Sequence, residues 1–208
     1  MNNLSLAVKF AIFSGMLIAS QQSLAGCSSS NPNSYSRALT TTAFSVSRNQ
    51  LNGPIGSPIS INPQGPTANV SCTGNAIQML KFGTQMVSSD YASDVYKTNV
   101  PGIGVKVWND WASSGWPGAQ IVTLSNNLQY WYDWRGVTSG ENYITNIKLQ
   151  FYVIGPVTAG NIELKTPTVE AYSNTSFSEA GAVRYSALSI TGSCLLYTSD
   201  AADDMQCV

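Results

Sequence analysis

The sequence predicts an all-β protein, a single sandwich of the jelly-roll or immunoglobulin-like kind. The clearest observation is residues 146–154, where apolar and polar side chains alternate strictly, the pattern of a strand with one buried face. Residues 161–164 and 184–191 repeat that pattern, and turn residues separate many other short apolar segments. Beyond the N-terminal segment no stretch has a 3.6-residue apolar period, which argues against helices.

The remaining elements follow from local composition. Residues 27–37 are rich in Ser and Asn and predict a loop, as do residues 135–142. Residues 51–66 hold four prolines, which predict an edge strand or a bulged connection because proline cannot donate to a ladder. Further strands are predicted at residues 41–47, 68–72, 76–82, 103–107, 119–124 and 128–134.

Residues 1–25 have the pattern of a secretory signal peptide. A single Lys precedes the apolar run 10–19, and Ser23-Leu24-Ala25 is a small-x-small cleavage site before Gly26. The run is too short to span a bilayer unaided, so we expect export without membrane insertion. A retained membrane anchor is the alternative.

Composition limits the chemistry that we expect. Only 10% of residues are charged and the net charge is −1, so no basic surplus exists to bind nucleic acid. Histidine is absent, which excludes a Ser-His-Asp or Cys-His nucleophile system. We expect no metal and no cofactor. A non-enzyme is predicted, although Asp110, Asp133 and Glu141 leave glycoside hydrolysis open.

The four cysteines fall into two pairs. Cys27 and Cys72 lie in the exported region, where they form either a disulfide, adding about 3–4 kcal/mol, or two free thiols. The second pair is Cys194 and Cys207. Residues 194–203, CLLYTSDAAD, resemble a translated transposase adapter from sequencing-library preparation. This predicts that 194–208 is an assembly artefact, that the genuine domain is 26–193 and that the gene continues further. A native acidic C-terminus is the alternative.

The candidate binding site lies around residues 108–116. A predicted strand, 103–107, leads into a polar, Gly-rich loop that carries three of the five tryptophans. Indole rings offer flat apolar faces, and neighbouring amides and carboxylates pair with hydroxyl groups, as a carbohydrate or receptor site requires. The predicted ligand-binding residues are Trp108, Asn109, Asp110, Trp111, Trp116 and Asp133. Alternatively, the tryptophans only close the end of a β-sandwich.

The order of several segments resembles the N-terminal receptor-binding domain of two-domain fimbrial tip adhesins of the chaperone–usher route, the type 3 fimbrial adhesins above all. The most specific piece is TNVPGIG, which opens residues 98–107. The other pieces are Cys27 after the signal peptide, residues 43–60, NVSCTG around Cys72, and residues 145–155 and 183–193.

This resemblance implies an elongated jelly roll with a Cys27–Cys72 disulfide and a receptor site among the tip or flank loops. It also implies a C-terminal pilin domain, missing from this chain, with a periplasmic chaperone, an usher and the next pilus subunit as partners. The protein would pass through the periplasm to the fimbrial tip and bind a glycan or matrix receptor. Mannose-binding residues cannot be matched one by one, so mannose is not implied. A structural pilus subunit and a secreted sugar-active enzyme stay open as alternatives.

Overall fold

The computed structural model describes residues 26–40, 43–47, 49–61, 65–111, 120–134, 139–192 and 194–199. This part of the chain consists of strands and connections, without an α-helix, so the all-β prediction is confirmed. The strands are β1 (Cys27–Ser30), β2 (Asn33–Ala38), β3 (Ala43–Ser47), β4 (Gly53–Ile61), β5 (Ala68–Cys72), β6 (Ala76–Phe82), β7 (Tyr96–Lys97), β8 (Ile103–Asp110), β9 (Ile121–Thr123), β10 (Gln129–Trp134), β11 (Ser139–Asn142), β12 (Ile147–Val153), β13 (Gly160–Ile162), β14 (Val169–Asn174), β15 (Val183–Thr191) and β16 (Cys194–Ser199).

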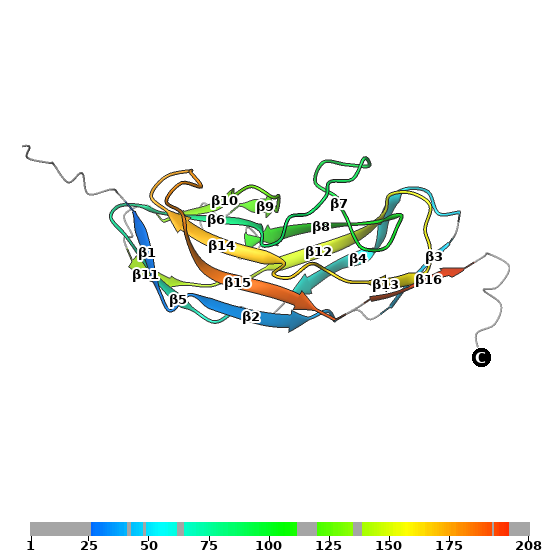
Figure 1. Ribbon diagram of the computed structural model, residues 1–208, viewed down its shortest axis with the longest axis horizontal. Coiled ribbons are helices and arrows are strands. Elements are labelled where there is room, and N and C mark those ends of the chain that lie inside the picture. Colours follow the sequence, from blue (N-terminus) through cyan, green and yellow to red (C-terminus); the bar gives the residue numbers. More distant parts are fainter. Residues whose placement is uncertain are drawn as a thin grey trace, which may run out of the picture.

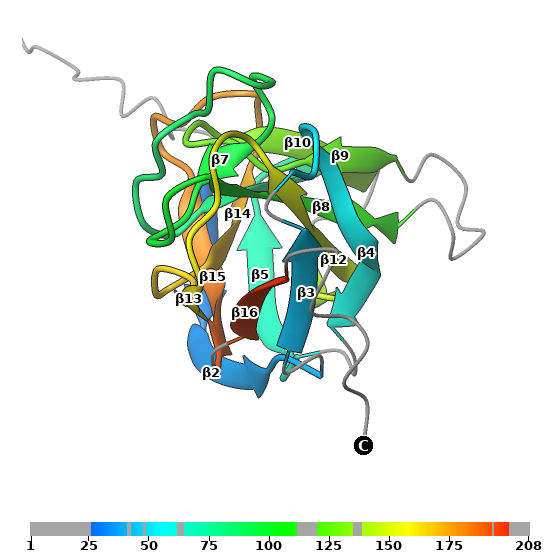
Figure 2. The same ribbon diagram turned by 90° about the vertical axis from the view of Figure 1, so that its right-hand side faces the viewer.

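Two five-stranded sheets form the sandwich. One has the order β10-β6-β14-β15-β2, and the other has the order β4-β12-β8-β7 with β9 paired to β8. Figure 2 looks along the long axis and shows β14 and β15 on one side and β8, β12 and β4 on the other. Two three-stranded sheets, β1-β5-β11 and β13-β16-β3, lie at opposite ends of the long axis (Figure 1).

The core lies between the two large sheets. On β12 the alternation predicted from the sequence is confirmed, because Ile147, Leu149, Phe151 and Val153 are all fully buried. Strand β8 pairs with β12 along its whole length and buries the inward side chains of 103, 105 and 107 against the same core. Each buried aliphatic or aromatic side chain stabilises the fold by about 1.5–3 kcal/mol relative to exposure.

The proline-rich segment forms the edge that its composition predicts. Strand β4 is the outermost strand of its sheet, and among the described strands its ladder partner is β12 alone. The register shifts between Leu149 and Phe151, so the pairing is also irregular there. The prediction of an edge or bulged segment is confirmed.

Several sequence-based assignments are wrong. Residues 27–37 are not a loop, because β1 pairs with β5 and β2 pairs in parallel with β15. Within the predicted loop 135–142, β11 pairs with β5, whereas residues 135–138 lie outside the described part. Strand β14 was not predicted, although it lies between β6 and β15. These segments are strands because partners far away in the sequence pair with them. Their own sequences are polar and show no strong alternation of apolar and polar residues, so the sequence did not predict them.

Cys27 and Cys72 form a disulfide. They are directly opposite each other in the β1–β5 ladder, so the bridge ties the first described strand to the body of the domain. Of the two alternatives left open by the sequence, a disulfide or two free thiols, the structure has the disulfide. By chain entropy it stabilises the fold by about 3–4 kcal/mol.

Strand β16 completes one end of the sandwich. It lies between β13 and β3 and supplies the ladder partners of both. The side chains of Cys194 and Leu196 are fully buried, whereas Leu195 is half-buried. The end of the domain at residue 193 stays a prediction, but in the structure residues 194–199 fill a strand position.

We expect Leu196→Ala to lower the free energy of unfolding by about 2–5 kcal/mol, because it leaves a cavity under β16. Leu195→Ala is the matched control. Because the Leu195 side chain is partly exposed, this variant should lower the free energy of unfolding by less than about 1.5 kcal/mol. Urea unfolding of the chain from Gly26 onward measures both. Equal, small losses would show that β16 adds little to the fold.

Two tyrosines, Tyr35 and Tyr185, should make the stability of the fold sensitive to alkaline pH. Tyr35, whose hydroxyl donates to the Ile144 carbonyl at 3.2 Å, has its pKa raised to about 12 by burial, with Arg37 opposing the rise. Burial also raises the pKa of Tyr185, whose hydroxyl has no hydrogen-bond partner among the described residues. The folded state therefore keeps protons that the unfolded chain loses above about pH 10, and stability falls as pH rises through that range.

We expect the free energy of unfolding to decline from about pH 10 upward, and Tyr185→Phe to reduce the slope by about 1.4 kcal/mol per pH unit. At neutral pH the same variant should lose little stability, because the hydroxyl that it removes is unpaired. Tyr91→Phe, at an exposed position, is the control. A slope unchanged by Tyr185→Phe would contradict the prediction.

Candidate functional site

The predicted loop starts later than its sequence suggests. Strand β8 continues through Asp110 because β12 and β9 both pair with its last residues. Trp108 lies opposite Lys148 on one side and Thr123 on the other. The prediction that the strand breaks into a loop before Asn109 and Asp110 is therefore wrong.

Because side chains alternate along a strand, Trp108 and Asp110 share the outer face of the sheet. Trp108 is half-buried. Asp110 is only 7% exposed and forms an ion pair with Lys148. This outer surface presents one indole ring, an ammonium group and the Thr123 hydroxyl, while the carboxylate of Asp110 is already neutralised.

Asn109 points the other way, into the protein, and is 1% exposed. Its Nδ2 donates to the Thr145 carbonyl at 2.7 Å, and its Oδ1 accepts from the Trp111 backbone N–H at 3.0 Å. Both ends of the amide are thus engaged with backbone groups. Asn109 fixes the end of β8 and the start of the segment that carries Trp111.

Trp111 belongs to an aromatic cluster between the two large sheets. Its ring meets that of Trp131 on β10 edge to face, with centroids 5.3 Å apart, and that of Tyr143 at 6.4 Å. Trp131 also contacts Tyr132 at 6.0 Å. Trp131 is buried, and the other three rings are half-buried, so the cluster has both a packing face and a solvent-accessible face.

The other two predicted residues do not join this group in the described structure. Trp116 lies outside the described residues. Asp133 is on β10, in the opposite sheet, where it pairs with Ile77, and its side chain is not described. Of the six residues, the structure places Trp108 and Asp110 on one surface and turns Asn109 and Trp111 toward the interior.

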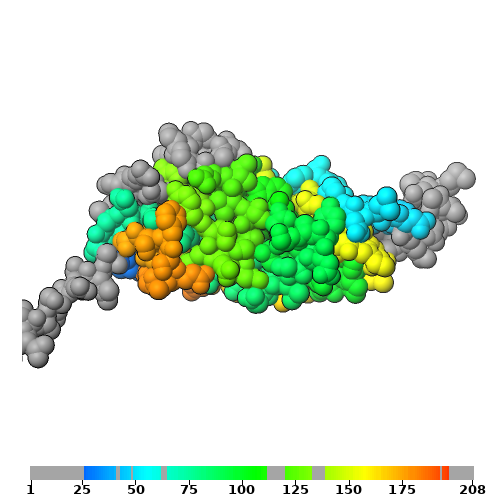
Figure 3. Space-filling model, turned by 90° about the horizontal axis from the view of Figure 1, so that it is seen from above, coloured from blue at the N-terminus to red at the C-terminus, as the bar shows by residue number. Residues whose placement is uncertain are grey.

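A pocket that the sequence did not reveal lies on the outer face of the other large sheet. It has a volume of about 370 Å³, and the 175–182 loop between β14 and β15 meets the 127–130 segment there. Figure 3 shows this loop, in orange, against the yellow-green residues of the 120–134 segment. We call it the Phe177 pocket; its lining includes Met79, Leu128, Tyr130, Phe177 and Glu179. The only signal in the sequence is one Phe among Ser, Thr and Glu residues.

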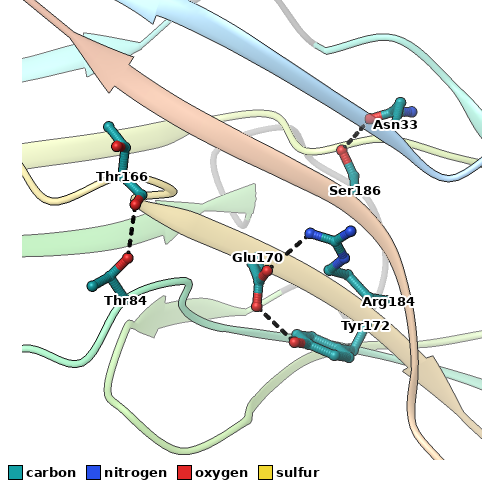
Figure 4. Close-up of polar contacts among 7 residues, drawn as sticks. All are labelled: Asn33, Thr84, Thr166, Glu170, Tyr172, Arg184 and Ser186. Atoms are coloured by element: carbon teal, nitrogen blue, oxygen red, sulfur yellow. Dashed lines mark hydrogen bonds and ion pairs between the residues drawn. The ribbon is translucent and has the colours of Figure 1, made fainter.

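Beside this pocket, three side chains form a closed polar group on β14 and β15 (Figure 4). Glu170 accepts a hydrogen bond from the Tyr172 hydroxyl at 2.6 Å and pairs with Arg184 at 3.0 Å. Burial, helped by the bond to Glu170 and its charge, raises the pKa of Tyr172, so its hydroxyl stays protonated. The charge of Glu170 is therefore satisfied within the sheet.

Other kinds of site are not evident in the described part of the chain. It holds no group of three or more His, Cys, Asp or Glu side chains that could bind a metal ion. Nor does it contain a helix with the length and apolar character needed to cross a membrane.

No protein-family model matches the chain, and no curated protein matches it in sequence. In structure the chain is similar to the receptor-binding domain of the plasmid-born adhesin MrkD1P of Klebsiella pneumoniae, with a TM-score of 0.49 and 16% identity over 85% of this chain and 98% of that one. It is also similar to the CupB6 tip adhesin from Pseudomonas aeruginosa, with a TM-score of 0.46 and 10% identity over 85% of this chain and 44% of that one. Similarity at these values transfers no residue and no ligand to this chain.

We expect Asn109→Ala to lower the free energy of unfolding by about 1–3 kcal/mol, because it leaves the Thr145 carbonyl and the Trp111 N–H without their partner. Asn52→Ala, at an exposed position before β4, should stay within about 0.5 kcal/mol of the parent. Thermal and urea unfolding measure both variants. Equal stability of the two variants would contradict a positioning role for Asn109.

Proposed function

We propose that this chain is the receptor-binding domain of a fimbrial tip adhesin, which attaches a bacterium by binding a glycan or a surface protein. The observation that carries the proposal is the ordered resemblance of its segments to such adhesins. The segments fall on the framework of the sandwich: 43–60 covers β3 and β4, 98–107 enters β8, 145–155 contains β12 and 183–193 contains β15. The resemblance thus supports the class of domain, whereas the ligand must be argued from exposed side chains.

The proposed receptor surface is centred on Trp108. Trp111 and Trp116 stay proposed ligand-binding residues, although Trp116 lies outside the described residues. The half-buried ring of Trp108 offers an apolar face beside the Lys148 ammonium and the Thr123 hydroxyl. In this proposal Asp110 holds Lys148, and Asn109 holds the backbone of Trp111, so both act by positioning. Asp133 stays a proposed hydrogen-bond partner.

Such a surface would bind weakly as a single domain. One stacked ring and a few hydroxyl bonds contribute about 1 kcal/mol each, because a ligand exchanges its bonds with water for these. Many fimbriae on one cell would raise the apparent affinity through multivalency. We propose that a C-terminal pilin domain links the adhesin to the next pilus subunit, with a periplasmic chaperone and an usher carrying it to the surface.

Glycan arrays and matrix-protein-coated plates, probed with the purified chain from Gly26 onward, test the proposal. We expect Trp108→Ala to weaken binding about tenfold, the loss of one stacking contact in a multivalent display. Tyr152→Ala is the matched control, because Tyr152 is another half-buried aromatic residue of the same sheet, on β12.

Circular dichroism should show that both variants keep the sandwich. Binding by Trp108→Ala at the parent level would remove Trp108 from the receptor surface. An absence of binding to every glycan and matrix protein tested would contradict the adhesin proposal itself.

A further inference from the structure

The Phe177 pocket is built on a floor that faces away from the main core. Tyr130 on β10 and Tyr172 on β14 are the ladder partners of Met79 on β6, so the three side chains form a row on one face of the sheet. Met79 is only 3% exposed, yet it is not part of the core cluster between the sheets. Met79 is therefore covered by neighbours on the outer face of the sheet, among them Tyr130 of the pocket lining and Tyr172 beside it.

Two side chains hold the wall of the pocket in place before any ligand arrives. Asn174 is buried, and its Nδ2 donates to the carbonyls of Ser178 at 2.8 Å and Ala180 at 3.1 Å. Glu179 Oε1 accepts the Leu128 N–H at 2.9 Å and so joins the loop to the turn before β10. A partner would pay little conformational entropy to order this loop.

Phe177 is the exposed ring of this preorganised loop. It is 66% exposed and meets Tyr130 edge to face, with centroids 4.7 Å apart at 78°. The two rings form a corner over Met79 and Leu128. A large apolar ring left in water on an ordered loop is stabilised when a partner covers it, by about 25 cal/mol for each Å² buried.

Among the described residues that line the pocket, Glu179 alone is charged, and its charge is negative. None of the described lysines or arginines forms an ion pair with it. Nearby, by contrast, Glu170 is neutralised by Arg184 (Figure 4). Glu179 Oε1 is occupied by the Leu128 N–H, and no donor among the described residues bonds Oε2.

From these contacts we propose that the Phe177 pocket binds a lysine side chain of a protein partner. The four methylene groups lie against Phe177 and Leu128, and the ammonium group reaches Glu179 Oε2 beside the aromatic rings, where a cation is favoured. Arginine fits less well, because its planar fork is best paired by both carboxylate oxygens and one is already used. A neutral sugar would leave the negative charge unmatched.

The methyl signal of ¹³C-labelled Met79 reports on the floor of the pocket in the intact chain from Gly26 onward. The probes are Nα-acetyl-lysine methylamide, which keeps its free ε-ammonium group, its uncharged analogue Nα-acetyl-norleucine methylamide, Nα-acetyl-arginine methylamide and a neutral methyl hexoside. We expect a saturable shift with the lysine probe, and an affinity at least about tenfold lower for norleucine and several-fold lower for arginine. Added salt should lower the affinity of the lysine probe, because its binding depends on an ionic contact. It should leave the affinities of the norleucine and hexoside probes unchanged.

Glu179→Gln is the decisive variant, because glutamine keeps the acceptor for the Leu128 N–H and removes only the charge. It should abolish the preference for lysine over norleucine, whereas Glu141→Gln, the same charge change on strand β11 outside the pocket lining, should leave it intact. Phe177→Ala should weaken both probes.

Three results would overturn the proposal: equal binding of norleucine and lysine, a shift with the hexoside but not with lysine, or no shift with any probe. The outcome is independent of the Trp108 surface, which lies on the other large sheet.

Discussion

The burial of one face of β12 and β8 against the opposite sheet is the constraint on which the rest of the structure depends. β12 lies between β4 and β8, and its inward residues are excluded from water along the whole strand. A strand has a period of two, so burying Leu149 also forces Lys148 outward. The ladder with β8 then places Trp108 beside Lys148 on the outer surface. The core thus sets the register of the surface that we propose for the receptor.

The two candidate binding surfaces lie on the outer faces of different sheets and are made rigid in different ways. Trp108 is on a strand with a partner on either side, so its backbone has little freedom. Phe177 is on a connection between two strands. Hydrogen bonds made by Asn174 and Glu179 restrict the backbone of this connection, as ladder hydrogen bonds restrict that of β8. In both cases a buried or paired polar side chain, rather than a ligand, maintains the geometry.

Whether a strand was predicted correctly depends on how much of its structure comes from its own residues and how much from its ladder partners. Strands that alternate strongly, such as β12, and the proline-rich edge β4 carry their structure in their own residues. β1, β2 and β14 do not, because their polar sequences become strands only when β5, β15 and β6 supply distant partners. Distant partners also decided the fate of one predicted site residue. Asn109 is polar and lies between Trp108 and Trp111 in the sequence, but β9 and β12 hold it in a strand whose alternation turns its side chain inward.

The sequence by itself determined the all-β class, the principal alternating strands, the proline-marked edge and the cysteines that could meet. Those properties depend on local composition and on a period of two, which are written along the chain. Tertiary structure decided that Cys27 and Cys72 are bonded, that Asp110 pairs with Lys148 and that Phe177, Met79 and Glu179 share a pocket. These contacts join residues far apart in the chain, and only the pairing of strands brings them within reach of one another.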